Sequence, residues 1–325
     1  MLTIAGSDSG GGAGIQADIK TIAALGCYAT TAITALTAQN TTGVQAVYPV
    51  SAGFLGQQIA SVCEDIGADA VKIGMFASLE NLEIIEAALK RYRMQHVVFD
   101  PVMMSSSGAS LLVAQSASPT SPDEGAAQIV KESGGQDLIT RVLAIANLSS
   151  LFTPNLLEAE FLTKIAIRSL EDMEEAGRAL ISKGLQAILV KGGHRLDAKG
   201  YPSAVVTDVL IQKNAASVIF ESPRLESKNL HGTGCTLSSA IASYLAKGLS
   251  LEEAVSKGRE FLIKAIKSGS GIRVGGGLVS LGSSFKTSNA LTPLNTIHPI
   301  GLSFRSGPLN HGFNPIPADF RAVDD

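Results

Sequence analysis

The feature that most constrains the fold of this chain is a regular alternation of short apolar runs with amphipathic stretches, which continues to about residue 280. Short apolar runs rich in β-branched residues are typical of buried strands, and longer amphipathic stretches are typical of helices. Strands that alternate with helices favour a mostly parallel sheet with helices on both of its faces. The sequence therefore predicts an α/β protein, a three-layer α/β/α sandwich around a mostly parallel central sheet.

The alternation places the elements and also shows where they stop. We expect strands at residues 1–5, 29–36, 70–73, 96–100, 151–153 and 187–190, and a hairpin from 204–211 and 218–221. We expect helices at residues 15–25, 53–66, 79–92, 155–164, 170–183, 235–246 and 251–268. Residues 114–136 and 280–307 lack periodicity and are rich in Ser, Thr, Pro or Gly, which is typical of mobile insertions. We expect one domain over residues 1–280, with an insertion at 114–136, and a second insertion with a C-terminal tail over 281–325.

Charge and composition exclude several classes of partner. The net charge of −3 gives no basic field for nucleic acid or an anionic membrane surface. Aromatic residues make up only 5% and Trp is absent, which leaves little for stacking on bases. No run approaches the roughly 18 apolar residues of a membrane span, and the first residues lack a signal-peptide pattern. Three widely spaced cysteines fit neither a disulfide framework nor a zinc site. We expect a cytoplasmic protein.

A glycine-rich loop at residues 6–14 (GSDSGGGAG) separates the first strand from the first helix. Glycines allow backbone amides to approach a ligand closely at the positive end of a helix. The spacing is not that of a dinucleotide fingerprint, and no Gly-Lys-Ser/Thr follows as in a Walker A loop. A ligand-binding loop and a plain tight turn are equally open at this point.

A second glycine pair lies in residues 231–240 (HGTGCTLSSA), just before the expected helix at 235–246. Gly232 and Gly234 would leave several N–H groups around one point, where the helix dipole adds partial positive charge. Such an anion hole suits a phosphoryl group in transfer. Cys235 falls in the first turn, a position that lowers the pKa of a thiol and favours the thiolate. The alternative is a capped helix with a buried cysteine, but glycines on both sides of Thr233 serve no obvious capping need.

Polar residues follow three other expected strands. Asn155 and Glu158, in TPNLLE at 153–158, suit either a hydrated Mg²⁺ or a helix capping box. Lys191, in VKGGH at 190–194, suits either a nucleotide phosphate or a surface turn. Gln39, in ALTAQNT at 35–41, can present a donor and an acceptor to a heteroaromatic ring or simply face solvent.

Together these segments resemble the hydroxymethylpyrimidine/phosphomethylpyrimidine kinases, a branch of the ribokinase-like superfamily. The resemblance also includes TIAGSDS (3–9), GIQADIK (14–20), KIGM (72–75) and DPVM (100–103). The segments occur in the family's order and extend to about residue 280. The later GPLNH at 307–311 looks like the motif that closes the family's kinase domain, displaced here by the second insertion.

The resemblance implies a reaction and a substrate pocket. ATP would phosphorylate 4-amino-5-hydroxymethyl-2-methylpyrimidine, and the same site would then convert the monophosphate to the diphosphate, in thiamine biosynthesis. Gln39 would recognise the pyrimidine edge, and Asp18 would lie near the pocket. The residues implied to line the pocket are Gly6, Ala13, Met75 and Val102.

The resemblance also implies the groups that handle the phosphates. Residues 232–235 would form the anion hole, with Thr233 and Lys191 beside the nucleotide. Asn155 and Glu158 match an element that lies near Mg²⁺ and phosphate in the superfamily. Cys235 stands where most ribokinase relatives place an aspartate base, so Cys235 as the base is a hypothesis. Relatives are commonly dimers, and we expect a homodimer.

One departure from the family pattern lies in the expected closing loop. Many relatives carry Ser-Gly-Asp where this chain has Ser-Gly-Ala at 107–109, so we expect an altered closing loop over an intact pocket.

Two alternative functions stay open. Pyridoxal kinase shares the fold and a Cys-containing anion hole, although the Ala-Gln-Asn segment favours the pyrimidine. A non-catalytic pyrimidine-binding relative is the other, against which the intact glycines, Lys191 and Cys235 argue.

Overall fold

The computed structural model describes residues 1–103, 136–193, 203–227 and 230–269. The expected insertion at 114–136 lies outside these ranges except for its last residue. The loop at 107–109 and the whole segment 281–325, with its motif at 307–311, also lie outside them. No helix in the described part of the chain is long and apolar enough to cross a membrane.

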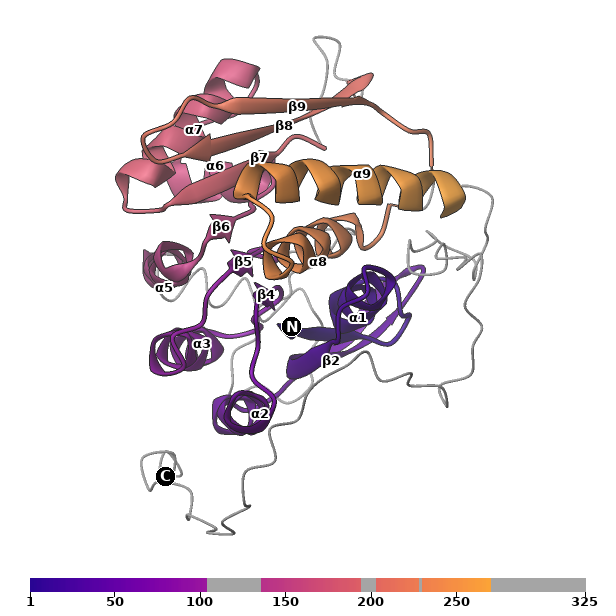
Figure 1. Cartoon of the computed structure of the whole chain (residues 1–325), viewed down its shortest axis with the longest axis vertical. Helices are drawn as coiled ribbons and strands as arrows, with labels where there is room; N and C mark the ends of the chain where they lie inside the picture. Colours follow the sequence, from indigo (N-terminus) through magenta and orange to yellow (C-terminus); the bar gives the residue numbers. More distant parts are fainter. Residues whose placement is uncertain (104–135, 194–202, 228–229, 270–325) are drawn as a thin grey trace. The chain divides into compact units, whose positions relative to one another are not determined.

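A nine-stranded sheet forms the centre of the described residues, in the order β3-β2-β1-β4-β5-β6-β7-β8-β9 (Figure 1). Neighbouring strands from β2 through β7 run parallel, whereas β3, β8 and β9 pair antiparallel. The mostly parallel sheet and the predicted hairpin at its edge are both confirmed. The strands are β1 (Leu2–Asp8), β2 (Thr30–Asn40), β3 (Gly43–Pro49), β4 (Val71–Ile73), β5 (Val97–Phe99), β6 (Leu151–Phe152), β7 (Ala187–Lys191), β8 (Val205–Gln212) and β9 (Val218–Pro223).

Helices cover both faces of the sheet, which confirms the predicted three-layer α/β/α sandwich (Figure 1). Apolar side chains of three helices pack on one face, and these are α1 (Gly14–Ala24), α8 (Thr233–Ala246) and α9 (Leu251–Gly269). The other face carries α2 (Ala52–Asp65), α3 (Leu79–Arg91), α5 (Gln136–Leu148), α6 (Leu156–Thr163) and α7 (Leu170–Ser182).

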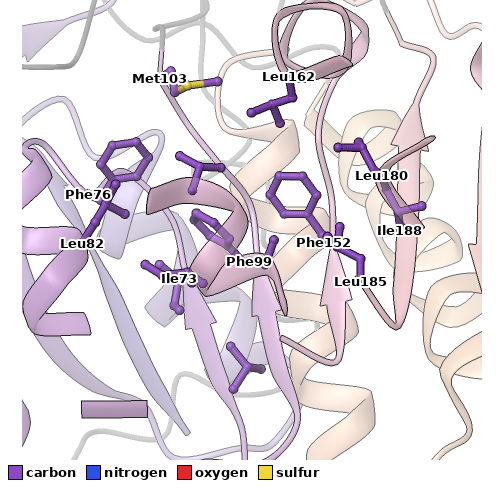
Figure 2. Close-up of a cluster of buried hydrophobic side chains, with 14 of the residues drawn as sticks. Ile73, Phe76, Leu82, Phe99, Met103, Phe152, Leu162, Leu180, Leu185 and Ile188 are labelled. Atoms are coloured by element: carbon purple, nitrogen blue, oxygen red, sulfur yellow. The ribbon is translucent and has the colours of Figure 1, made fainter. Parts of the chain in front are cut away.

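The core beneath the second group of helices fixes the ends of the central strands. Phe99 at the end of β5 and Phe152 at the end of β6 lie side by side, with ring centroids 5.3 Å apart (Figure 2). Phe76 meets Phe99 edge-on at 6.4 Å, and all three side chains are fully buried. Each buried aromatic ring contributes about 1.5–3 kcal/mol relative to exposure. The chain leaves this rigid layer directly at Asp100 and Thr153, whose positions are thereby set.

Two elements and two extensions differ from the sequence prediction. β1 continues past residue 5 to Asp8, so the first three residues of the glycine-rich segment belong to the strand. β2 continues to Asn40 and turns into β3, because the Asn40 side chain accepts hydrogen bonds from the amide and hydroxyl of Thr42 and closes the turn. Gln39 therefore lies on a paired strand and not in a loop. The helix α5 begins at the last residue assigned to the insertion. Its buried residues have helical spacing, but they follow a stretch without periodicity that masked its start.

Candidate active site

The polar residues singled out from the sequence gather at the carboxyl ends of the parallel strands. β1 ends at Asp8 and β7 at Lys191, while Asp100 and Asn155 follow β5 and β6. Ligands of open parallel sheets bind at this edge. A cavity of about 450 Å³ lies instead at the amino ends of β4 and β5, lined among others by Tyr92. It contains none of the predicted site residues, so the carboxyl edge is the candidate active site.

The first glycine-rich loop is folded around the carboxylate of Asp8. The amides of Gly10, Gly12 and Ala13 donate to its two oxygens at 2.8, 3.0 and 2.8 Å. Burial by itself would raise the pKa of Asp8, but hydrogen bonds from His231 and from these amides lower it, so the group is a carboxylate. Three of the amides that could have met a ligand thus bind the chain's own Asp8. For them the tight-turn interpretation holds.

The starts of α1 and α8 converge at this loop. Gly232, at the N-cap of α8, has a φ of 85°, and a Cβ placed on it would lie 1.9 Å from the Gly12 carbonyl oxygen and 3.4 Å from Ala13 Cα. Only glycine permits this approach and this backbone conformation. Among the described residues no side chain caps α1 or α8, and neither helix has an acidic residue in its first turn. Two positive helix ends therefore meet at one point, with no carboxylate from their own first turns.

Cys235 does not have the ionisation that its place in the first turn of α8 predicts. The pKa of its thiol is raised to about 11, chiefly by burial and also by the carboxylates of Asp18 and Asp100. The Lys72 ammonium and a hydrogen bond from the Gly14 amide offset these effects only in part. The predicted thiolate is wrong, because the sequence argument counted the helix end but neither the burial nor the nearby carboxylates. Near pH 7 the group is a neutral thiol.

Asp18 lies in the core and not on the wall of the pocket. Its carboxylate accepts from Lys72 Nζ at 2.8 and 2.9 Å, from the Thr3 hydroxyl at 2.6 Å and from the Ser239 hydroxyl at 2.7 Å. The side chains of Asp18 and Lys72 are both 0% exposed. The expectation that Asp18 faces the substrate is corrected: its oxygens are occupied, and it joins α1, β4 and α8 beneath the start of α8.

Lys191 forms a buried ion pair with Asp100 at the start of α8. The Lys191 Nζ lies 2.5 Å from Asp100 Oδ1, and the side chains are 14% and 1% exposed. Burial alone would lower the pKa of Lys191, but the charge of Asp100 and the neighbouring Glu158 raise it. A Cβ on Gly234 would stand 3.4 Å from Asp100 Oδ2 and 3.6 Å from Lys191 Nζ. The predicted lysine and the predicted anion hole are therefore neighbours.

Asn155 and Glu158 form the capping box that the sequence left open. The Asn155 side chain accepts from the Glu158 amide at 2.9 Å, and the Glu158 side chain accepts from the Asn155 amide at 2.8 Å. The pKa of Glu158 is raised to about 7, chiefly by burial; the Lys191 charge opposes this shift and the Asp100 charge adds to it. Among the described residues no three His, Cys, Asp or Glu side chains are arranged to hold a metal ion. The carboxylates of Glu158 and Asp100 beside Lys191 still fit a Mg²⁺ that keeps most of its water and phosphate ligands.

Three of the residues expected to line the substrate pocket lie together. A Cβ on Gly6 would stand 2.7 Å from Met75 Sδ, so the glycine leaves room for that side chain. Met75 packs in a small apolar cluster at the ends of β2 and β3, and Val102 contacts the same cluster. Ala13 lies against Gly232, and the next residue, Gly14, packs on the Gly6 carbonyl. The apolar cluster suits the face of a small heteroaromatic ring.

Gln39 connects this apolar cluster with the start of α8. Ser9 Oγ bonds both its backbone amide and its carbonyl, at 2.8 and 2.6 Å. One end of its side-chain amide lies 3.0 Å from His231 Nε2, which is also 3.0 Å from Asp8 Oδ2. A substrate ring that contacts Gln39 would therefore lie beside the residue that leads into α8.

Four residues that organise the site had no role in the sequence argument. Asp8, His231, Lys72 and Asp100 all stood inside the quoted motifs. Asp8 had a visible signal, because a short acidic side chain before consecutive glycines is a common acceptor for the amides of a turn. The other three become visible only when distant strands are brought together.

The family model described as phosphomethylpyrimidine kinase matches residues 8–122 and 123–281. The chain belongs to this family. It is 41% identical to a hydroxymethylpyrimidine/phosphomethylpyrimidine kinase of Bacillus subtilis, over 85% of this chain and 92% of that protein. It is 44% identical to a thiamine biosynthesis bifunctional protein of Geobacter sulfurreducens over 82% of its length, and spans about half (49%) of that longer protein. Membership makes it an ATP-using kinase.

Solved structures agree with this assignment. A phosphomethylpyrimidine kinase of Clostridium difficile is 39% identical, with a TM-score of 0.64 over 82% of this chain and 98% of that one. An ADP complex of Bacillus subtilis pyridoxal kinase is 32% identical, with a TM-score of 0.66 over 82% of this chain and 90% of that one. The fold is common to both activities, but the sequence relatives are pyrimidine kinases. The pyridoxal kinase alternative is not favoured, and neither is a non-catalytic one.

Proposed function

We propose that this chain transfers the terminal phosphoryl group of ATP to the hydroxymethyl group of 4-amino-5-hydroxymethyl-2-methylpyrimidine, and then phosphorylates the monophosphate to the diphosphate. The observation that carries the proposal is the start of α8, which has no side-chain cap among the described residues and lies between two sets of groups. On one side is the Lys191–Asp100 pair, and on the other are His231 and Gln39. Donor and acceptor of the phosphoryl group would meet there.

The amides of Gly234 and Cys235 would bind the transferring group, while the Thr233 amide donates to the Leu230 carbonyl oxygen at 3.3 Å. These amides belong to the first turn, where a helix has no internal partners for its N–H groups, and the dipole favours negative charge. Phosphoryl transfer is catalysed mainly by positioning and charge stabilisation. A preorganised ring of donors is therefore the group that the reaction requires most.

Lys191 would leave Asp100 when phosphate binds. Its ammonium is held 2.5 Å from the Asp100 carboxylate and next to Gly234, so a short movement would bring it to a phosphate oxygen. Asp100 would then be free to face the cation that accompanies the nucleotide. Glu158, beside the same pair, would be the second oxygen ligand, and Asn155 would act through its cap of α6. Mg²⁺ at this point would neutralise charge on the phosphates.

The neutral thiol of Cys235 is not suited to remove a proton from the substrate alcohol at the outset. The transition state of phosphoryl transfer is largely dissociative, so the alcohol needs little activation before it attacks. Cys235 would serve by shape and by its amide, and the proton would leave late in the reaction.

A coupled assay of ADP release tests the proposal directly. The full chain is given ATP and Mg²⁺ with the pyrimidine alcohol, with its monophosphate, or with pyridoxal. We expect turnover with both pyrimidines and a kcat/KM for pyridoxal at least about 100-fold lower, because Gln39 is placed to read a ring edge that pyridoxal does not have. Equal turnover of pyridoxal would overturn the substrate assignment, and no pyrimidine-dependent ADP release would overturn the function.

We also propose that the protein is a homodimer of the cytoplasm, as relatives of this kind commonly are. Sedimentation velocity of the full chain would give one species of about twice the mass of the 325-residue chain. A single species of monomer mass would exclude the dimer.

A further inference from the structure

His231 bonds two polar groups through the same ring nitrogen. Its Nε2 lies 3.0 Å from Asp8 Oδ2 and 3.0 Å from one end of the Gln39 side-chain amide. The His231 and Asp8 side chains are only 16% and 4% exposed, so water competes little for these contacts. The structure places Gln39 Nε2 at the end that faces His231 and Gln39 Oε1 at the other end, 3.2 Å from Thr37 Oγ1, but the two atoms have the same shape and exchange places when the amide is rotated by 180°.

Hydrogen-bond accounting assigns the direction of each contact. Asp8 accepts from three backbone amides, and hydrogen bonds from His231, Ala13 and Gly10 lower the pKa of its carboxyl group, so it is ionised. An ionised carboxylate only accepts, so His231 Nε2 must carry the hydrogen. A nitrogen that donates to Asp8 cannot also accept from an NH₂ group. The end of Gln39 that faces His231 must therefore be its oxygen.

The opposite end of the amide leads to the same assignment independently. The hydroxyl hydrogen of Thr37 is directed to the Ser7 carbonyl oxygen at 2.9 Å. The Thr37 oxygen is then an acceptor, and the group of Gln39 that faces it must be the NH₂. The oxygen and nitrogen of a side-chain amide have the same shape, so their partners decide the orientation. Both partners require the same one.

We propose that His231 is a positioning residue for substrate specificity: by donating from Nε2 it holds the Gln39 amide with its oxygen toward His231 and its nitrogen toward Thr37. This rests on the proposed function, in which Gln39 meets the edge of the substrate ring. With one lone pair and one N–H already used, the amide has one acceptor and one donor left in a fixed order. An aminopyrimidine edge offers the matching amino hydrogen and ring nitrogen. A 4-oxo ring, with a carbonyl and a ring N–H, offers the reverse order and is rejected.

The test compares the 4-amino substrate with its 4-oxo analogue in the full-length enzyme. For the wild type we expect kcat/KM to favour the amino compound at least about 100-fold, since a reversed hydrogen-bond pattern leaves buried groups unpaired. In His231→Phe the side-chain amide of Gln39 can rotate by 180°, and the preference for the amino compound should fall at least about tenfold. Ser9→Ala is the matched control. It removes the hydrogen bonds of Ser9 to the Gln39 backbone but leaves the partners of the Gln39 side-chain amide in place, so it should lower kcat/KM equally for both compounds.

Equal losses for both compounds in His231→Phe, with the preference unchanged, would show a merely structural role and overturn the proposal. If that variant does not fold, Thr37→Val removes the partner at the other end of the amide and should also lower the preference. If the wild type phosphorylates neither compound, the proposed function fails, and the ratio of the two dissociation constants replaces the ratio of rates.

A measurement without substrate decides the orientation itself. Nitrogen-15 NMR of the wild-type protein should show a protonated Nε2 on His231, with a coupling through the hydrogen bond to the carboxylate carbon of Asp8 or the side-chain amide carbon of Gln39. An unprotonated Nε2 would overturn the proposal whatever the enzyme phosphorylates.

Discussion

The starts of the helices differ sharply between the active-site edge and the rest of the fold. Ser51 caps α2, Ser78 caps α3, and Ser169 forms a capping box with Asp172 at α7. Side-chain caps and acidic first turns satisfy the free amides of a helix and its dipole. In the described chain α1 and α8 have neither. At α1 the chain's own groups meet the open end, since Asp8 accepts from the Ala13 amide and the Cys235 thiol from the Gly14 amide. The start of α8 is therefore the end that indicates a bound ligand.

α6 lies between these two cases. It begins at the same edge of the sheet, yet the side chains of its capping box accept from the amides of Asn155 and Glu158. These two amides are therefore not available to a phosphate in the way those of Gly234 and Cys235 are. The comparison assigns phosphate binding to α8 and leaves α6 to hold Glu158 in place.

The largest effect should come from filling the space at the start of α8. Gly232→Ala places a methyl group 1.9 Å from the Gly12 carbonyl oxygen at a φ of 85°, so the two glycine loops must separate. We expect kcat/KM to fall about 1000-fold or more, as when several preorganised donors are lost. Gly248→Ala is the matched control at the other end of α8, with a φ of 84° and nothing within 4 Å. It should cost about 1 kcal/mol in the free energy of unfolding and leave kcat/KM unchanged. Similar losses of activity in both would refute the assignment.

Removing the charge beside α8 should give the next largest effect. Lys191→Met is expected to lower kcat/KM about 100-fold, and it also leaves the buried Asp100 unpaired, at about 3–5 kcal/mol of unfolding free energy. The double variant Lys191→Met, Asp100→Asn removes the unpaired charge and should recover most of that stability. Urea unfolding and steady-state kinetics measure both quantities. Recovery of activity in the double variant would mean that Lys191 only neutralises the charge of Asp100 and does not act on the phosphate.

Cys235 should matter much less than its place in α8 suggests. With a thiol pKa of about 11, the group stays neutral below about pH 10, and no ionisation of Cys235 should shape kcat/KM between pH 6 and 9. Cys235→Ala should retain turnover within about tenfold of the wild type, because a weak base contributes little to a dissociative reaction. Iodoacetamide should react slowly with this thiol at pH 7.5 and faster as the pH approaches 11. A pH-independent rate above pH 7 would show the thiolate after all.

The smallest effect on activity is expected at α3, whose start is already capped by a side chain. Ser78→Ala removes the side chain that accepts from the Asn81 amide and should cost about 1 kcal/mol of stability without a change in kcat/KM. Asn155→Ala removes a cap of the same kind at α6. An activity loss there beyond the stability loss would show that Asn155 also contacts the nucleotide or its cation.

Local patterns were enough to predict most of the fold. The parallel order of the sheet follows from alternating strands and helices, since parallel neighbours need crossover connections. β3 was missed because its pairing with β2 depends on a turn closed by a single asparagine. The helix α5 was missed because its first turn follows an aperiodic segment.

The site was predictable as a set of strand ends but not as a set of charges. Which polar groups lie at the carboxyl edge follows from the topology. The pairing of Asp18 with Lys72 and the neutral thiol of Cys235 depend on burial and on partners more than 50 residues away, as in the Lys72–Asp18 contact with a separation of 54. Desolvation is a property of the packed molecule, and no short motif contains it.

The most direct test of the central claim follows the backbone amides at the start of α8 when the phosphates bind. Proton–nitrogen NMR spectra of the full chain are recorded with Mg²⁺ and a non-hydrolysable ATP analogue, before and after the pyrimidine alcohol is added. The amide protons of Gly234 and Cys235 should shift downfield as they bond phosphate oxygen, while that of Asn81 at the capped start of α3 should not move. Unchanged Gly234 and Cys235 signals at saturating ligand would contradict the account.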